Sequence, residues 1–450
     1  MVRYQNANGA ALAALVVLML LASGIVRAQT SAIDRGQIER WRFSPPPVTP
    51  HPGQWDPANP PPAERMVATE DKVYVQSSFE VVYALDGKTG EILERYDDAR
   101  LVPEVEEGVF YVYYDTDLHA LDARSGRELW SYDFNFIFDL DEIETGDGQI
   151  YITGSIKLFD FINLYGRKIF AIAADSGQLR WSEAWQSTGL TGLDGMVGAL
   201  FARTFEMGWS HQILSFYASD SGELLWAYGI SRPYPAEDSS AFLRLASSPR
   251  PLTASAEAVY VATNIEEEMG GNRHVLVGGV VFALARKTGE VLRKYEMEGT
   301  YINLATNRRG DVYVDAESST IALDGRTGER LWGGAFGTNL IAGEVIYGQS
   351  YEKGEFVAVN ARSGERLWRL ENENGFYSVS PGDHMIVAAG VLYAASRDGI
   401  LHAIDAATGK VVWTCEMGGK LLPSALVNGT LYVRTGGGGI AALDIRAVSF

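Results

Sequence analysis

The chain has 450 residues, with 38 Lys and Arg against 57 Asp and Glu, and a formal net charge of −19. A single core usually stops growing at about 250–300 residues, so the length predicts either two domains or a repeat array. The acidic balance argues against a nucleic-acid-binding protein, whose affinity comes largely from basic residues, and against attachment to anionic lipid.

Residues 1–28 differ in character from the rest of the chain. Arg3 precedes an apolar run from Ala10 to Ala22, and the small residues Val26 and Ala28 follow it. A basic start, a short apolar core and small residues before the cut are typical of a secretory signal peptide, so we expect cleavage near Ala28. An uncleaved anchor is the alternative, although a spanning helix needs about 20 apolar residues. The expected location is periplasmic or secreted, with no stable membrane span after signal cleavage.

Residues 29–63 are expected to hold a closing strand and a proline-rich linker. Residues 44–63 contain nine of the 16 prolines, a composition typical of an extended segment that is poor in backbone donors. We expect this stretch to carry the chain into a repeated region at 64–450. A ligand for a proline-reading domain is the alternative interpretation.

One phrase recurs through the repeated region. "LHALDARSGRELWSYDF" at 118–134 returns as "TIALDGRTGERLWGGAF" at 320–336 and "LHAIDAATGKVVWTCEM" at 401–417. Residues alternate on both sides of a turn that opens with Asp or a relative and closes with Gly, which predicts a β-hairpin with glycine at the left-handed position. The turn glycines are Gly90, Gly126, Gly177, Gly222, Gly289, Gly328, Gly364 and Gly409.

Six of these eight units carry a tryptophan four residues after the turn glycine. Glu94 and Arg293 take that place in the other two units. An indole is large enough to fill the gap between two packed sheets, so we expect each tryptophan to lie between neighbouring units. The six are Trp130, Trp181, Trp226, Trp332, Trp368 and Trp413.

Each hairpin follows further apolar runs, such as "GDVYVDA" from Gly310 and "AGVLYAAS" from Ala389, which gives about four short strands per unit. Successive turn glycines lie 36 to 67 residues apart. Four strands repeating at this spacing are typical of β-propeller blades, which cover each other's faces when packed around an axis. The predicted fold is therefore an all-β propeller of four-stranded blades.

These "LYALDAxTGxxxW"-like units resemble the pyrroloquinoline-quinone-type propeller repeat. That repeat occurs in quinoprotein dehydrogenases and in BamB-type outer-membrane assembly proteins. The resemblance covers about residues 64–445, and it implies a fold more specifically than a function.

The chain ends indicate how the ring closes. The last unit stops after "GGIAALD" at 438–444, without a tryptophan strand, and "IERWRFS" at 38–44 matches the missing strand with Trp41 in the plug position. Eight complete hairpins plus this split one make nine units, whereas the resemblance implies eight blades. We expect eight blades, with nine as the count that the repeats allow, because the fourth unit around 192–207 breaks the pattern.

Several units are longer than the repeat, and loops on a rigid scaffold often carry binding. The insertion "KLFDFINLYGRK" at 157–168 carries an aromatic and aliphatic group that is unusual on a solvated loop. We expect either a partner-binding patch or a loop folded onto the neighbouring blade. The residues concerned are Phe159, Phe161, Leu164 and Tyr165. Further insertions lie at 231–250 and 264–279.

The sequence offers no set of catalytic residues. Cys415 is the single cysteine and is expected to be a small buried residue, and the six histidines show no metal-ligand spacing. The resemblance implies adjacent cysteines and a calcium ion beside the quinone in the dehydrogenases, and this chain lacks such a cysteine pair. No catalytic, cofactor or metal residue is therefore assigned, and no cofactor is predicted, with quinone plus calcium as the alternative.

These observations favour a non-catalytic exported propeller that binds protein partners of the cell envelope, akin to the BamB-type proteins in outer-membrane protein biogenesis. Exposed blade edges can pair with an extended segment of a partner. Two alternatives stay open: a periplasmic quinoprotein oxidoreductase, which would be an enzyme, and a ligand-binding or sensor propeller.

Overall fold

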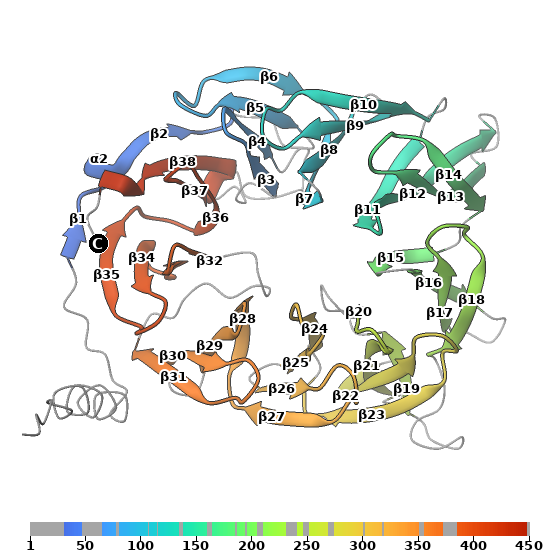
Figure 1. The fold of residues 1–450 in the computed structure, drawn as a ribbon. Coiled ribbons are helices and arrows are strands. Elements are labelled where there is room, and N and C mark those ends of the chain that lie inside the picture. The colour runs from blue at the N-terminus through green and yellow to red at the C-terminus, as the bar shows by residue number, and fades with distance from the viewer. Residues whose placement is uncertain are drawn as a thin grey trace, which may run out of the picture.

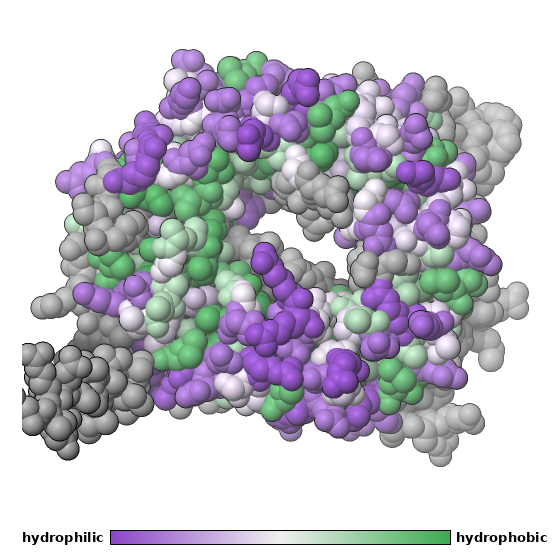
Figure 2. Space-filling model, viewed as in Figure 1, coloured by the Kyte–Doolittle hydropathy of each residue, from purple (hydrophilic) through white to green (hydrophobic). Residues whose placement is uncertain are grey.

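A computed structural model shows nine small antiparallel sheets arranged as the blades of one ring (Figure 1). A central opening is also visible in the space-filling view (Figure 2). The structure describes residues 31–46, 65–77, 81–106, 108–114, 116–134, 138–159, 164–184, 187–193, 196–204, 210–230, 241–245, 252–268, 274–299, 302–316, 319–350, 355–371 and 385–447. The predicted signal peptide and most of the proline-rich linker lie outside these residues.

The first three blades follow the chain from the centre of the ring to its rim. The first contains β3 (Arg65–Ala68), β4 (Lys72–Gln76), β5 (Val82–Asp86) and β6 (Ile92–Tyr96). The second contains β7 (Arg100–Glu106), β8 (Val109–Tyr114), β9 (Asp117–Asp122) and β10 (Glu128–Asp133). The third contains β11 (Phe138–Gly146), β12 (Gln149–Phe159), β13 (Leu164–Ala173) and β14 (Leu179–Ala184).

The next three blades include one with an additional strand. The fourth contains β15 (Ser187–Leu193), β16 (Met196–Thr204), β17 (Ser210–Ala218) and β18 (Leu224–Gly229). The fifth contains β19 (Ala241–Leu245), β20 (Leu252–Ala254), β21 (Ala258–Glu268), β22 (His274–Ala285) and β23 (Val291–Met297). The sixth contains β24 (Ile302–Thr306), β25 (Val312–Ala316), β26 (Ser319–Leu323) and β27 (Arg330–Gly334).

The last three blades include both strands from the N-terminal segment. The seventh contains β28 (Gly337–Ala342), β29 (Val345–Ser350), β30 (Glu355–Asn360) and β31 (Arg366–Glu371). The eighth contains β32 (Met385–Ala388), β33 (Val391–Ala395), β34 (Ile400–Asp405), β35 (Val411–Glu416) and β1 (Ser31–Ile33). The ninth contains β36 (Leu421–Val427), β37 (Thr430–Thr435), β38 (Gly439–Asp444) and β2 (Glu39–Phe43).

The predicted ring closure is confirmed, because β2 pairs antiparallel with β38 and completes the ninth blade. The N-terminal segment also makes a contact that the sequence did not indicate. β1 pairs in parallel with β35 of the eighth blade, and the four-residue helix α2 (Arg35–Ile38) then crosses to the ninth blade. Residues 31–43 therefore tie two neighbouring blades together. Two short 3-10 turns, Gly436–Gly438 and Ile445–Ala447, flank β38.

The described residues form nine blades, the count that the repeats allowed, and not the preferred eight. The irregular fourth unit is a complete blade. Its second strand carries Gly198 where other blades have a buried tyrosine, and Phe216 on the paired strand lies directly opposite that glycine. The ring of Phe216 lies 4.3 Å from that of Trp226, so an aromatic side chain from the neighbouring strand fills the same space.

The core is divided among the joints between blades. In the first blade β4 and β5 are buried almost throughout, whereas the outer strand β6 is exposed along most of its length. This gradient arises because each blade covers both faces of the inner strands of its neighbours. No helix in the described part of the chain is long and apolar enough to cross a membrane.

Candidate functional site

The predicted plug tryptophans lie in the joints between consecutive blades. Six of them donate the indole Nε1–H to a backbone carbonyl of the next blade at 2.8–3.1 Å. The acceptor is always the second residue of the hairpin turn in the next blade. For Trp41, which lies in the ninth blade, the next blade around the ring is the first. The pairs are Trp41 with Gly87, Trp130 with Ala174, Trp181 with Ser219, Trp226 with Arg286, Trp332 with Ala361 and Trp368 with Ala406.

The turn glycines receive these indole rings from the preceding blade. All eight have positive φ, a conformation that costs other residues free energy. Six of them also lie directly against a tryptophan of the preceding blade, so that a Cβ would overlap the ring. These are Gly90, Gly177, Gly222, Gly289, Gly364 and Gly409. Gly126 lies against the Tyr74 hydroxyl and Gly328 against the Tyr295 hydroxyl, so tyrosine takes the place of tryptophan where the preceding blade lacks it.

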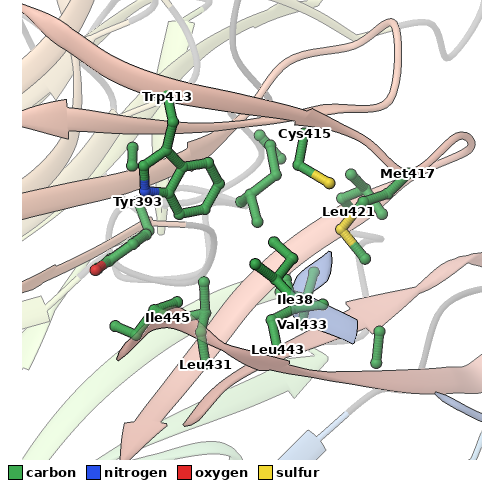
Figure 3. Packing of buried hydrophobic residues seen from close by; sticks show 14 of the residues in the cluster. Ile38, Tyr393, Trp413, Cys415, Met417, Leu421, Leu431, Val433, Leu443 and Ile445 are labelled. Atoms are coloured by element: carbon green, nitrogen blue, oxygen red, sulfur yellow. The ribbon is translucent and has the colours of Figure 1, made fainter. Parts of the chain in front are cut away.

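Trp413 differs from the other plugs. Its side chain is fully buried, at 0 % exposure, in the joint between the eighth and ninth blades, beside Ile38, Leu443 and Ile445 (Figure 3). Its Nε1–H finds no acceptor among the described residues. The ninth blade takes its outer strand β2 from the N-terminal segment, and the 3-10 turn Ile445–Ala447 follows β38 in place of the hairpin turn that offers a carbonyl in the other joints.

The predicted partner-binding loop falls largely outside the residues whose side chains are described. Phe159 ends β12 and pairs with Leu164 at the start of β13, and Tyr165 pairs with Lys157. Phe161 lies outside the described residues. The insertion therefore extends the second hairpin of the third blade, and its role in binding stays a prediction.

The outer strands carry a feature that the sequence analysis missed. Large aliphatic side chains that follow the turn glycine are exposed in five consecutive blades. They are Ile92, Leu93, Leu129, Leu179, Leu224, Leu225, Val291 and Leu292. The signal was present as aliphatic residues two or three places after the glycine, but the ring geometry decides that this end of the outer strand faces solvent.

The eighth blade shows that the outer strand of a blade can pair with a further strand. There β1 pairs in parallel along the outer strand β35, whereas Val411 at the start of β35 is buried against the seventh blade. Ser31 lies opposite Trp413, and Ile33 lies opposite Cys415 and packs on the buried cluster of this joint. An extended segment thus binds to the outer edge of a blade within this molecule. A free outer strand offers a row of backbone donors and acceptors for such pairing.

Two small groups of polar side chains in the described residues contact one another through hydrogen bonds. Ser396 bonds both Asp398 and the Nε2 of His402, the latter at 2.9 Å, and burial lowers the pKa of His402 to about 4. His119 lies 3.0 Å from the Glu128 carboxylate. Within the described ranges, no three His, Cys, Asp or Glu side chains are grouped as a metal site.

Cys415 is buried in the joint between the eighth and ninth blades, and burial raises the pKa of its thiol. It is the one cysteine of the chain, so the adjacent pair that accompanies the quinone in the dehydrogenases cannot form. The residues present do not match that cofactor arrangement, and no step through a quinone is derived.

The ring of repeated blades, in which β2 and β38 complete the ninth blade, defines a β-propeller. The chain belongs to the family described as "Outer membrane protein assembly factor BamB", which matches residues 27–205, 210–339 and 352–447. The expected family resemblance is therefore confirmed.

Solved structures that are similar to this chain include BamB from Moraxella catarrhalis, with a TM-score of 0.44, 15 % identity and coverage of 77 % of this chain and 96 % of that one. The quinohemoprotein alcohol dehydrogenase from Comamonas testosteroni has a TM-score of 0.42 and 15 % identity, over 94 % of this chain and 79 % of that one.

One curated relative is the serine/threonine-protein kinase AfsK of Streptomyces griseus, 29 % identical over 86 residues. The matched stretch is 19 % of this chain and only 10 % of the kinase.

Proposed function

We propose that this protein is a non-catalytic, exported scaffold that binds protein partners of the cell envelope during the assembly of outer-membrane proteins. The observation that carries the proposal is the pairing of β1 with β35, beside a series of outer strands whose aliphatic residues are exposed. Membership of the family described as an outer-membrane protein assembly factor supports the same role.

The charge distribution fits a partner of basic character. The chain carries a net charge of −19, and exposed acidic residues such as Glu91, Glu223 and Glu290 directly follow turn glycines beside the exposed aliphatic pairs. Opposite charges across a contact steer encounter and disfavour wrong partners. The N-terminal segment, with the features of a signal peptide, supports export to the compartment where such partners occur.

The proposal is tested with the mature chain as bait in envelope extract from its natural host. We expect co-purification of outer-membrane β-barrel proteins or of their assembly machinery. A Leu224→Lys, Leu225→Lys variant, which places lysine on an exposed outer edge, should recover less of them. A matched Arg366→Lys variant on the outer strand of the seventh blade should recover as much as the wild type. Recovery of no envelope protein would contradict the scaffold role.

A further inference from the structure

The fifth blade projects a hairpin arm beyond the rest of the blade. β21 and β22 pair along their whole length, from Ala258 opposite Ala285 to Glu268 opposite His274. The outer strand β23 pairs only with Gly279–Leu284 of β22 and ends at Met297. Residues 274–278 of β22 therefore continue past the outer strand.

This part of β22 is covered on one side only. β19 pairs with Thr263–Glu267 and covers the far side of β21. Within the described residues, no strand pairs with the other edge of β22 between His274 and Gly278. In the arm, β21 is thus paired on both sides, whereas the outer edge of β22 is open.

The open edge is apolar. Val275, Leu276 and Val277 are 45 %, 40 % and 49 % exposed, although consecutive side chains point to opposite faces of a strand. Soluble proteins usually protect an edge with lysine, proline or a covering segment, and a run of three exposed apolar residues requires a functional reason. Val277 also lies at a bulge in the pairing with β21, where the register shifts between Ile265 and Glu266.

Acidic residues lie beside this apolar run. Glu266 pairs with Leu276, Glu267 with Val275 and Glu268 with His274. A further strand on β22 would lie about 10 Å from β21, which is close enough for the exposed carboxylate of Glu267 to favour a cation. The edge therefore combines exposed aliphatic side chains with a negative field.

A hollow of about 580 Å³ lies between the fifth and sixth blades. Met297 and Glu298, where β23 ends, line it together with Ile321, Gly333 and Gly334. Glycines in an edge strand allow another backbone to approach closely. Met297 pairs with Gly279 of β22, so the hollow adjoins the place where a strand paired with the open edge would meet the end of β23.

We propose that the open edge of β22, from Val275 to Val277, binds an extended segment of a partner protein in which aliphatic residues alternate with lysine or arginine. Main-chain pairing supplies the attachment, and the exposed valines and leucine contact the aliphatic side chains. β1 on β35 is the example of such pairing within the molecule. The inference rests on the proposed scaffold function and identifies the segment chemistry and the place where it binds.

The test uses the purified mature chain and a short synthetic peptide of alternating valine and lysine. We expect saturable binding and slower amide exchange at residues 275–277. A Leu276→Ser, Val277→Ser variant leaves the charge unchanged and should weaken binding at least tenfold, or about 1.4 kcal/mol. Ala407→Ser, at an exposed position in the hairpin turn of the eighth blade, should bind like the wild type.

A peptide with N-methyl groups on alternate amides separates strand pairing from simple apolar or charge attraction. It should bind at least about tenfold more weakly, because it cannot complete the backbone ladder. Equal binding of both peptides, equal loss in Ala407→Ser, or no saturable binding at about 1 mM would overturn the assignment. Retained capture of envelope proteins by the Leu276→Ser, Val277→Ser variant would reject this site while leaving the scaffold function supported.

Discussion

Trp332 of the sixth blade lies so close to Gly364 of the seventh that a Cβ at position 364 would stand 2.6 Å from the indole Cγ. The same indole donates its Nε1–H to the Ala361 carbonyl at 2.9 Å, in the turn that Gly364 closes. The turn glycine of one blade and the tryptophan of the blade before it are thus two halves of one joint, although each recurs separately in the sequence.

Replacing Gly364 by alanine should destabilise the fold more than the same change at another left-handed glycine. The φ of +70° costs alanine about 1–2 kcal/mol, and the overlap with Trp332 adds about 1–3 kcal/mol. Gly343 has a similar φ of +61° but no atom within 4 Å of an added Cβ, so Gly343→Ala is the matched control. Denaturant unfolding of both variants measures the difference, and equal losses would show that Trp332 does not constrain the glycine.

The indole hydrogen bond can be isolated by comparing two buried plugs. Trp368 is 3 % exposed and donates to the Ala406 carbonyl at 2.9 Å, whereas Trp413 is fully buried without an acceptor among the described residues. Phenylalanine removes the same volume from either joint but deletes a hydrogen bond only from the first. We expect Trp368→Phe to lower the free energy of unfolding by about 1 kcal/mol more than Trp413→Phe. A larger loss at Trp413 would mean that its Nε1–H is satisfied.

The sequence predicted the ring because the joint residues recur locally. The hairpin turn, its glycine and the following tryptophan lie within a few residues of each other, so their spacing is visible without any knowledge of the fold. The partnership between Trp332 and Gly364 was not visible, because it joins residues of different repeats. The same holds for β1, whose pairing with β35 links residues more than three hundred positions apart.

The preferred count of eight blades was wrong because one position of the fourth unit departs from the repeat. The residue opposite it on the paired strand compensates for the change. The fourth unit lacks the tyrosine of the second strand, and Gly198 there made the segment look unlike a blade strand. The paired residue Phe216 supplies the missing ring. In the other blades that carry a tryptophan, the residue opposite the tryptophan is alanine, such as Ala322 opposite Trp332. A pattern that exchanges large and small residues across a strand pair keeps the volume but changes the sequence motif.

This exchange predicts a rescue. Phe216→Ala should cost about 3–5 kcal/mol, because it removes a fully buried ring beside Trp226. Adding Gly198→Tyr restores the arrangement of the other blades and should recover part of that loss, measured as unfolding free energy in a double-mutant cycle. Gly198→Tyr alone should destabilise through overpacking. If the double variant is as unstable as the sum of the two single variants, the two positions do not share one space.

Shortening the N-terminus should separate the roles of β1 and β2. A mature chain that starts at Asp34 loses only β1, whereas one that starts at Ser44 also loses the buried side chains of Ile38, Trp41 and Phe43. We expect the shorter chain to be less stable by at least about 3–5 kcal/mol, the cost of Trp41 alone. Equal denaturant midpoints for the two chains would show that the ninth blade does not need its outer strand.

Asp315 should make the joint between the sixth and seventh blades sensitive to pH. Its Oδ1 accepts hydrogen bonds from the Thr320 hydroxyl at 2.8 Å and from the Thr338 backbone N–H at 2.9 Å, and burial raises its pKa from 3.8 to about 6. The folded state thus holds this proton at a pH where the unfolded chain has released it. The contribution of Asp315 to stability is therefore largest below about pH 4 and is lost as the pH rises through 6.

An Asp315→Asn variant keeps the acceptor oxygen but carries no ionisable proton. Its stability relative to the wild type should rise between pH 4 and 7 and level off above that range, by about 3 kcal/mol at most for a shift of about two pKa units. Unfolding free energies of both proteins, measured at a series of pH values, test this expectation. A difference that does not change with pH would show that Asp315 ionises in the folded protein as it does in the unfolded chain, and that the two bonds to its carboxylate offset the cost of burial.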